Sequence, residues 1–216
     1  IDSYKTVGEN IYEMIKKDII FCNLRPLKKL KLNELKINYK TSISTLREIL
    51  SRLAGDGFVV YKEQKGFYVS PVSKSDLKEI ANLRILIESH ALKYSLENSN
   101  PDWEGSLLAA HHKLNLYENK LLKNKTEERS NWKRYDSEFH QTLVRNCNSK
   151  NLIELHKLIF DKYLRYQLLV LTFRGSGSIE EHKKLLDYSL ERNFKKAQMV
   201  LEEHIQNGII HANKSF

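Results

Sequence analysis

The sequence predicts a mainly α-helical protein that carries one small β-hairpin in its N-terminal third. The 216 residues include only three prolines and eight glycines, and apolar residues recur at helical spacing over most of the chain. The exception is the segment FVVYKEQKGFYVSPV. In it, two runs of β-branched and aromatic residues, Phe58 to Tyr61 and Phe67 to Val72, flank a short link that contains Gly66. This pattern is typical of a hairpin.

Three helices are predicted before the hairpin, over Lys5 to Ile20, Asn33 to Tyr39 and Ile43 to Asp56. Asn33 is expected to cap the second helix and Ser42 the third, since both side chains can accept a backbone N–H. The order helix, helix, turn, helix, hairpin indicates a winged helix-turn-helix. It predicts a DNA-binding domain over residues 1–72.

The remaining residues, 73–216, are expected to form a second, all-helical domain of about six helices. The first four are predicted over residues 75–97, 101–122, 126–147 and 149–173, with Ser75 and Asn100 as caps of the first two. A flexible break is expected at residues 175–178. The last two helices each carry histidine and are separated by a tight turn at residues 191–193.

Composition excludes several classes of protein. Hydrophobic residues make up 41% of the chain and charged residues 29%, and no apolar run reaches the roughly 18 residues needed to span a bilayer. Two isolated cysteines, Cys22 and Cys147, fit a reducing compartment, so a cytoplasmic protein without membrane contact is expected. The net charge is +9, and residues 1–73 carry 13 basic against 8 acidic side chains. This excess favours a polyanionic partner.

Four side chains in the C-terminal half are spaced to hold one metal ion. Asp136 and His140 stand four residues apart, so on a helix they project from one face. His182 and His204 are each 11 residues from Asn193, so a helical hairpin turning there places them opposite each other. One carboxylate and three imidazoles suit a divalent transition metal such as zinc or nickel. Two alternatives stay open: a hydrogen-bonded cluster without metal, and His211 in place of one ligand.

The DNA-reading residues are expected at the start of the third helix and at the tip of the hairpin. In a helix-turn-helix the N-terminal residues of the second helix of the motif meet the base edges. The candidates are Ser42, Ile43, Ser44, Thr45 and Arg47, with Lys65 and Gly66 at the wing tip. The alternative is that Ser42 only caps the helix, that Arg47 is a solvated surface residue and that Gly66 only makes the turn.

The segment LRPLKKLKLNELKINYKTSISTLREILSRLAGDGFVVYKEQKGFYV resembles the GntR family of bacterial transcription regulators. Residues that match the family pattern include Pro26, Glu34, Arg47, Gly57 and Gly66. The chain departs from the pattern at two places. Leu27 replaces a turn glycine, and Ile43 stands where the family usually has a base-reading arginine, so Arg47 becomes the main candidate for direct readout.

The rest of the chain resembles the FCD effector domain of that family, through LRILIESHAL, YDSEFH and EEHKKLLDYSLERNFKKAQMVLEEHI. The resemblance implies a homodimer, a small organic acid as effector and a metal on Asp136, His140, His182 and His204. It also makes Arg84 a candidate for the effector carboxylate, with a surface salt bridge as the alternative.

These features together predict a metabolite-responsive transcription regulator that binds a double-stranded DNA operator and is not an enzyme. Two other classes are weighed against it. A metal-dependent hydrolase could use the same centre to activate water, but the sequence shows no nucleophile motif and no phosphate loop. A DNA-binding protein with a purely structural metal is the third possibility.

Overall fold

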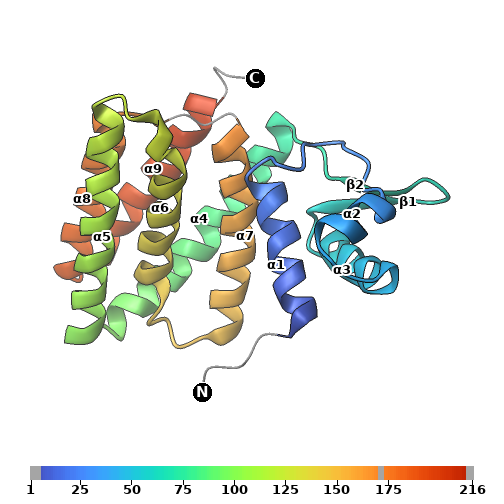
Figure 1. Ribbon diagram of the computed structural model, residues 1–216. Coiled ribbons are helices and arrows are strands. Elements are labelled where there is room, and N and C mark those ends of the chain that lie inside the picture. Colours follow the sequence, from blue (N-terminus) through green and yellow to red (C-terminus); the bar gives the residue numbers. More distant parts are fainter. Residues whose placement is uncertain (1–5, 170–172, 213–216) are drawn as a thin grey trace. The chain divides into compact units, whose positions relative to one another are not determined.

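The computed structural model describes residues 6–169 and 173–212, and it divides into two compact units. The first unit ends at Ser73 and the second begins at Lys74. Nine α-helices and one two-stranded sheet are found in the described residues (Figure 1). None of the helices within those ranges has the length and apolar character required to cross a membrane.

The first unit is a winged helix-turn-helix. Its elements in chain order are α1 (Val7–Ile20), α2 (Leu32–Asn38), α3 (Ile43–Gly55), β1 (Val59–Lys62) and β2 (Gly66–Val69). The strands are antiparallel, with Val59 opposite Val69 and Lys62 opposite Gly66. The core is formed by the apolar face of α3, which packs against α1, α2 and β1. That face carries Leu46, Ile49, Leu50 and Leu53, all at most 1% exposed.

Caps explain where these helices begin. The Ser42 hydroxyl accepts the N–H of Thr45 at 3.0 Å, as the sequence predicts for an N-cap. Asn33 does not cap α2; Lys31 holds that position without a side-chain cap, and Asn33 lies inside the first turn. The first helix begins at Val7, because Thr6 caps it through a capping box with Glu9. The predicted start, Lys5, is two residues earlier and lies outside the described residues.

The second unit is a bundle of six α-helices, with a short 3-10 turn at Thr126–Glu128. They are α4 (Lys74–Glu97), α5 (Pro101–Leu122), α6 (Arg129–Val144), α7 (Lys150–Leu169), α8 (Ser176–Leu190) and α9 (Phe194–Ala212). Helix α4 packs against α6, α7 and α9, and α5 packs against α6 and α8. Helices α8 and α9 form an antiparallel pair that turns at residues 191–193. Asn100 caps α5 as predicted, accepting the N–H of Trp103 at 2.8 Å.

Several predicted boundaries in this unit are wrong. Ser75 lies in the first turn of α4 instead of capping it, and the helix expected from Thr126 starts as a 3-10 turn. Residues 176–178 belong to α8 and are not a flexible break. Gly175, at φ 71°, is the N-cap of α8, and the Ser178 hydroxyl donates to its carbonyl at 3.0 Å. The expected helix 149–173 ends at Leu169, and residues 170–172 are outside the described part.

Candidate metal centre and DNA-binding surface

The four side chains predicted to hold a metal lie together inside the second unit. Helix α6 supplies Asp136 and His140, α8 supplies His182 and α9 supplies His204. One possible ligand atom from each residue can be chosen so that all four lie within 4.8 Å of one another. The tight turn after α8 brings the rings of His182 and His204 together, with their centroids 4.6 Å apart and their planes tilted by 51°. All four residues are buried, with exposures of 6% or less.

A carboxylate lies at the far side of each histidine ring. Nδ1 of His140 is 2.5 Å from Glu88 of α4, Nδ1 of His182 is 2.7 Å from Glu118 of α5, and Nδ1 of His204 is 2.7 Å from Glu181 of α8. An ionised carboxylate can only accept, so each Nδ1 donates, and the lone pair of each neutral imidazole is then on Nε2. This arrangement fixes the tautomer and orientation that a metal ligand needs.

The atoms left over converge on the same place. Nε2 of His140, Nε2 of His182 and Oδ2 of Asp136 are buried and make no hydrogen bond to any residue that the structure describes. Nε2 of His182 also lies 3.4 Å from Oδ1, the other carboxylate oxygen of Asp136. Buried polar atoms without partners are rare in folded proteins. Their convergence, with the donor types of the set, fits a divalent transition metal ion.

Charges around the cluster separate the pKa values of its histidines. Burial lowers the pKa of His182, but the carboxylates of Glu118 and Asp136 outweigh it and raise that pKa to about 9. Burial lowers the pKa of His140, with the charge of Arg84 acting in the same direction. Burial and the neighbouring His182 hold the pKa of His204 well below its usual range. The carboxyl pKa of Asp136 is also well below its usual range, because Lys133 and His182 outweigh the opposing effect of burial.

Arg84 is buried, so the alternative of a surface salt bridge is wrong. The residue is 1% exposed, and its Nε donates to Glu88 at 2.8 Å. Its guanidinium carbon lies 4.4 Å from the ring centroid of Phe160 and 4.7 Å from that of Tyr163. Arg84 therefore holds the carboxylate that orients His140. Its two terminal nitrogens make no hydrogen bond within the described ranges.

A small cavity of about 20 Å³ opens beside the four ligands. Asp136, His182 and His204 form part of its wall, together with Lys133, Arg174 and other polar side chains. Arg174 is held in place, since its guanidinium pairs with Glu181 and lies 3.1 Å from Nδ1 of His204. Lys133 is 1% exposed, with its Nζ 3.8 Å from Oδ2 of Asp136. Burial lowers the pKa of Lys133 to about 8, against the opposing charge of Asp136.

The remaining histidines do not join the cluster. His211, the alternative ligand, is not among the grouped residues, and His90 and His112 are exposed. His156 is buried with its Nε2 3.3 Å from Glu88, so it contacts the same carboxylate as His140 without reaching the ligand set.

Sequence reasoning missed the residues that support the ligands: Glu88, Glu118, Glu181 and Lys133. A signal existed for two of them. Glu118 stands four residues after Leu114 on a mostly apolar helix face, and Glu88 stands four residues after Arg84; both glutamates are 0% exposed. A charged residue at a core position of an amphipathic helix needs a buried partner, because an unpaired charge is costly there.

The expected DNA-reading residues lie on α3 and the wing. Ser42, Ser44 and Arg47 are exposed, while Ile43 and Thr45 are half-buried. At the wing tip Lys65 is exposed and Gly66 has a φ of 86°.

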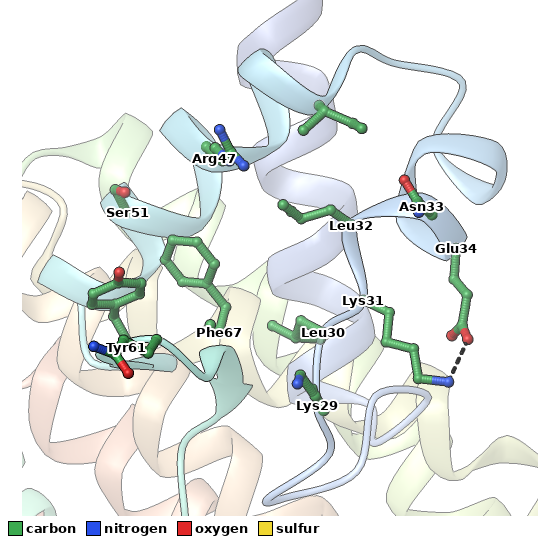
Figure 2. Close-up of a pocket in the computed structure, with 13 residues that line it drawn as sticks. Lys29, Leu30, Lys31, Leu32, Asn33, Glu34, Arg47, Ser51, Tyr61 and Phe67 are labelled. Atoms are coloured by element: carbon green, nitrogen blue, oxygen red, sulfur yellow. Dashed lines mark hydrogen bonds and ion pairs between the residues drawn. The ribbon is translucent and has the colours of Figure 1, made fainter.

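A groove runs between α2, α3 and the wing. Figure 2 shows Arg47 and Ser51 of α3 on one side of it and Tyr61 and Phe67 of the wing facing them. Ile43 and Gly66 also line this groove. Arg47 makes no ion pair or hydrogen bond through its side chain to any described residue. The wall of the groove therefore carries the Arg47 guanidinium, which has no partner among the described residues, together with the aromatic rings of Tyr61 and Phe67.

Comparison with known sequences identifies both units. The family described as bacterial regulatory proteins, gntR family, matches residues 7–69, and the FCD domain family matches residues 79–207. The chain belongs to the GntR family of regulators that carry an FCD domain. It is a DNA-binding transcriptional regulator, as predicted.

Relatives of this GntR regulator extend over most of its length. The HTH-type transcriptional regulator BphR of Paraburkholderia xenovorans is 28% identical over 97% of this chain and 86% of its own. The HTH-type transcriptional repressor GlaR of Escherichia coli is 28% identical over 90% of each chain. The solved structure of McbR/YncC from E. coli superposes with a TM-score of 0.81, at 21% identity, over 98% of this chain and 99% of the other. That last likeness concerns the fold.

The structure of this GntR regulator explains one departure from the family pattern. Leu27, which replaces the turn glycine, has a φ of 64°. That left-handed conformation suits glycine and is strained for leucine. The turn keeps its shape because the N–H of Leu27 donates to the carbonyl of Val69 at 3.0 Å, which ties the turn to the wing. Ile43, the second departure, faces the groove beside Arg47.

Proposed function

We propose that this regulator is a cytoplasmic homodimer whose binding to a DNA operator is modulated by a small organic acid. The acid would bind at, or next to, one divalent transition metal ion such as zinc or nickel. The observation that supports this most strongly is the convergence of unpaired nitrogen and oxygen atoms from Asp136, His140 and His182, with His204 beside them. A carboxylate stands behind each imidazole and holds it in the ligating tautomer.

A bound metal ion and the chain's own Arg84 would together bind the anion. A bound divalent ion would offer a Lewis acid to a carboxylate oxygen. Arg84 is the proposed second contact, because both of its terminal nitrogens are buried without a hydrogen bond to any described residue. Tyr163, which lies against its guanidinium, lines the cavity beside the ligands. A carboxylate there would satisfy donors that the folded chain leaves unpaired.

The operator would be read by α3 and the wing. Arg47 is the proposed base-reading residue, since it is exposed and uncommitted. The hydroxyls of Ser42, Ser44 and Thr45 suit phosphates or base edges, and Ile43 offers an apolar contact. The backbone and side chain at Lys65 and Gly66 would reach the neighbouring minor groove or phosphates.

The dimer would form through α4. Leu83, Leu86, His90 and Tyr94 stand three or four residues apart on that helix, so they make one exposed stripe. Leu83 is 45% exposed and Leu86 67% exposed. The rings of His90 and Tyr94 lie 5.0 Å apart within the stripe. Large apolar side chains exposed in a row are typical of an interface.

A purely structural metal is the second candidate, supported by the burial of all four ligands. Metal removal separates the two functions. Chelator treatment, or the variants His182→Ala and His204→Ala, should abolish the effect of an acid on operator binding and leave most of the DNA affinity. His112→Ala, which changes an exposed histidine, is the control.

Metal content by elemental analysis and operator affinity in gel shifts are the two measurements. Equal metal content in wild type and the double variant His182→Ala/His204→Ala would contradict the site. Loss of folding upon chelation, with no acid response beforehand, would favour the structural metal.

A further inference from the structure

We infer that Lys133, Trp132 and Gln167 form a second half of the effector site, beside the metal ligands, and that this half selects a short hydroxycarboxylate. The inference rests on the proposed function, because it takes the acid response as given and names the class of acid. The three residues line the cavity that Asp136, His182 and His204 also line.

Lys133 supplies a buried ammonium group that lacks a suitable acceptor. The residue is 1% exposed, yet the nearest carboxylate oxygen, Oδ2 of Asp136, is 3.8 Å away. Its other contact is the ring of Trp132, with Nζ 3.7 Å from the centroid. The ammonium group makes no hydrogen bond within the described ranges. Burying a cation in this way is costly, so a ligand anion that accepts from Nζ would be strongly favoured.

Two further groups in the same wall are also unsatisfied. Nε1 of Trp132, a donor, and Oε1 of Gln167, an acceptor, are buried without partners in the part of the chain that the structure describes. Trp132 is 4% exposed and Gln167 7% exposed, so bulk water does not solvate them. One carboxylate can accept from both Lys133 and Trp132. A carboxylate cannot donate to Gln167, whereas a hydroxyl group can.

The size of the cavity limits the length of the ligand. A volume of about 20 Å³ leaves room for one or two water molecules. Even an acid of about two or three carbons is larger than this, so the wall must move to admit it, and a longer acid would need a larger movement. A second carboxylate would also bring a negative charge next to Oε1 of Gln167 and Asp136. These observations favour a 2-hydroxy acid over a longer dicarboxylate.

The test compares matched acids on the full chain loaded with zinc. The probes are glycolate and acetate, and then lactate, pyruvate and propionate, titrated calorimetrically. The hydroxy acid of each set should bind about tenfold or more tightly than the acid that lacks the hydroxyl, because only the hydroxyl pairs with Gln167. Gln167→Met should remove this preference. Equal affinity of hydroxy and unsubstituted acids, or no binding by any of the five, would overturn the inference.

Lys133→Met tests the anion contact, with Arg134→Met as the matched control, since Arg134 is the exposed neighbour on the same helix. Lys133→Met should weaken every acid about tenfold or more while zinc content stays at the wild-type level. The ligand-free variant should unfold at the same or a higher temperature, because a buried unpaired charge is gone. Unchanged acid affinity in Lys133→Met would also overturn the inference. If other organic acids still alter operator binding through the metal, the proposed function survives that failure.

Discussion

Nδ1 of His182 on α8 lies 2.7 Å from a carboxylate oxygen of Glu118 on α5, and both residues are at most 1% exposed. The two residues are 64 positions apart in the chain. This pairing turns Nε2 of the histidine toward Asp136, where the other ligand atoms gather.

The first expected outcome follows from that pairing. Glu118→Gln keeps an acceptor but loses the charge that makes the imidazole a stronger ligand, so zinc affinity should fall about tenfold. Glu118→Leu removes the acceptor and should approach the upper end of a 10–100-fold loss. Competition with a chromogenic chelator measures both. Glu127→Gln, which changes an exposed carboxylate, should bind zinc like the wild type; equal affinities for all the variants would show that Glu118 does not support the site.

The DNA-reading role of Arg47 has a direct test. Arg47→Ala should cost about 1–3 kcal/mol on a specific site and relax the preference at one base position. Selection from genomic fragments followed by gel shifts would measure it. Arg145→Ala removes the same charge from an exposed position of the second unit and should leave affinity nearly unchanged. A selection that enriches no sequence, with Arg47→Ala matching the wild type, would exclude this role.

The exposed stripe on α4 should control the oligomeric state. Leu86→Glu places a charge in the centre of the proposed interface and should shift the protein to a monomer at micromolar concentration, as seen by light scattering. Leu122→Glu is the control, because Leu122 is also partly exposed, at 46%, but lies at the end of α5. A monomeric wild type, or a dimeric Leu86→Glu variant, would place the interface elsewhere or remove it.

Tyr39 should make the stability of the first unit sensitive to alkaline pH. Its hydroxyl donates to Asp18 at 2.5 Å, and burial together with that carboxylate raises the pKa of Tyr39. The unfolded chain ionises this tyrosine near pH 10, whereas the folded chain keeps it neutral. The hydrogen bond therefore contributes fully below pH 10, and its contribution falls as the pH rises above that value.

Tyr39→Phe should lower the free energy of unfolding by about 1 kcal/mol at neutral pH. The difference from the wild type should shrink above pH 10, in urea titrations followed across that range. Tyr68→Phe is the control, since the Tyr68 hydroxyl makes no hydrogen bond to a described residue. A difference that stays constant with pH would show that the Tyr39 pair does not carry this dependence.

The sequence predicts that the four candidate ligands come together, but it does not predict the residues that surround them. Local spacing predicts that Asp136 and His140 share a helix face, and symmetry about Asn193 predicts that His182 and His204 meet. Both predictions depend on contacts within one helix or one hairpin. The pairing of Glu118 with His182 joins two helices distant in sequence, so only tertiary packing could reveal it.

The starts of helices α2 and α4 were predicted wrongly because they also depend on more than local sequence. Asn33 and Ser75 have side chains suited to capping, but the chain enters each helix one or two residues earlier than their positions require. The sequence leaves two roles open for Arg84, an effector contact or a surface salt bridge. The sequence around it does not show which face of α4 packs against other helices. The packing of α6, α7 and α9 around α4 decides that Arg84 is inside.

Helix α4 has a mechanical consequence for regulation. One face of it carries Glu88, which contacts the candidate ligand His140, while another carries the exposed Leu86. Its first residue, Lys74, directly follows the first unit in the sequence. Glu88 lies 14 residues from that first residue, about 21 Å along the axis. A tilt of about 5° pivoting at Glu88 would therefore displace the start of the helix by about 2 Å. A small rotation of α4 about the buried Glu88 would thus become a displacement of Lys74, the residue at which the second unit follows the first in the sequence.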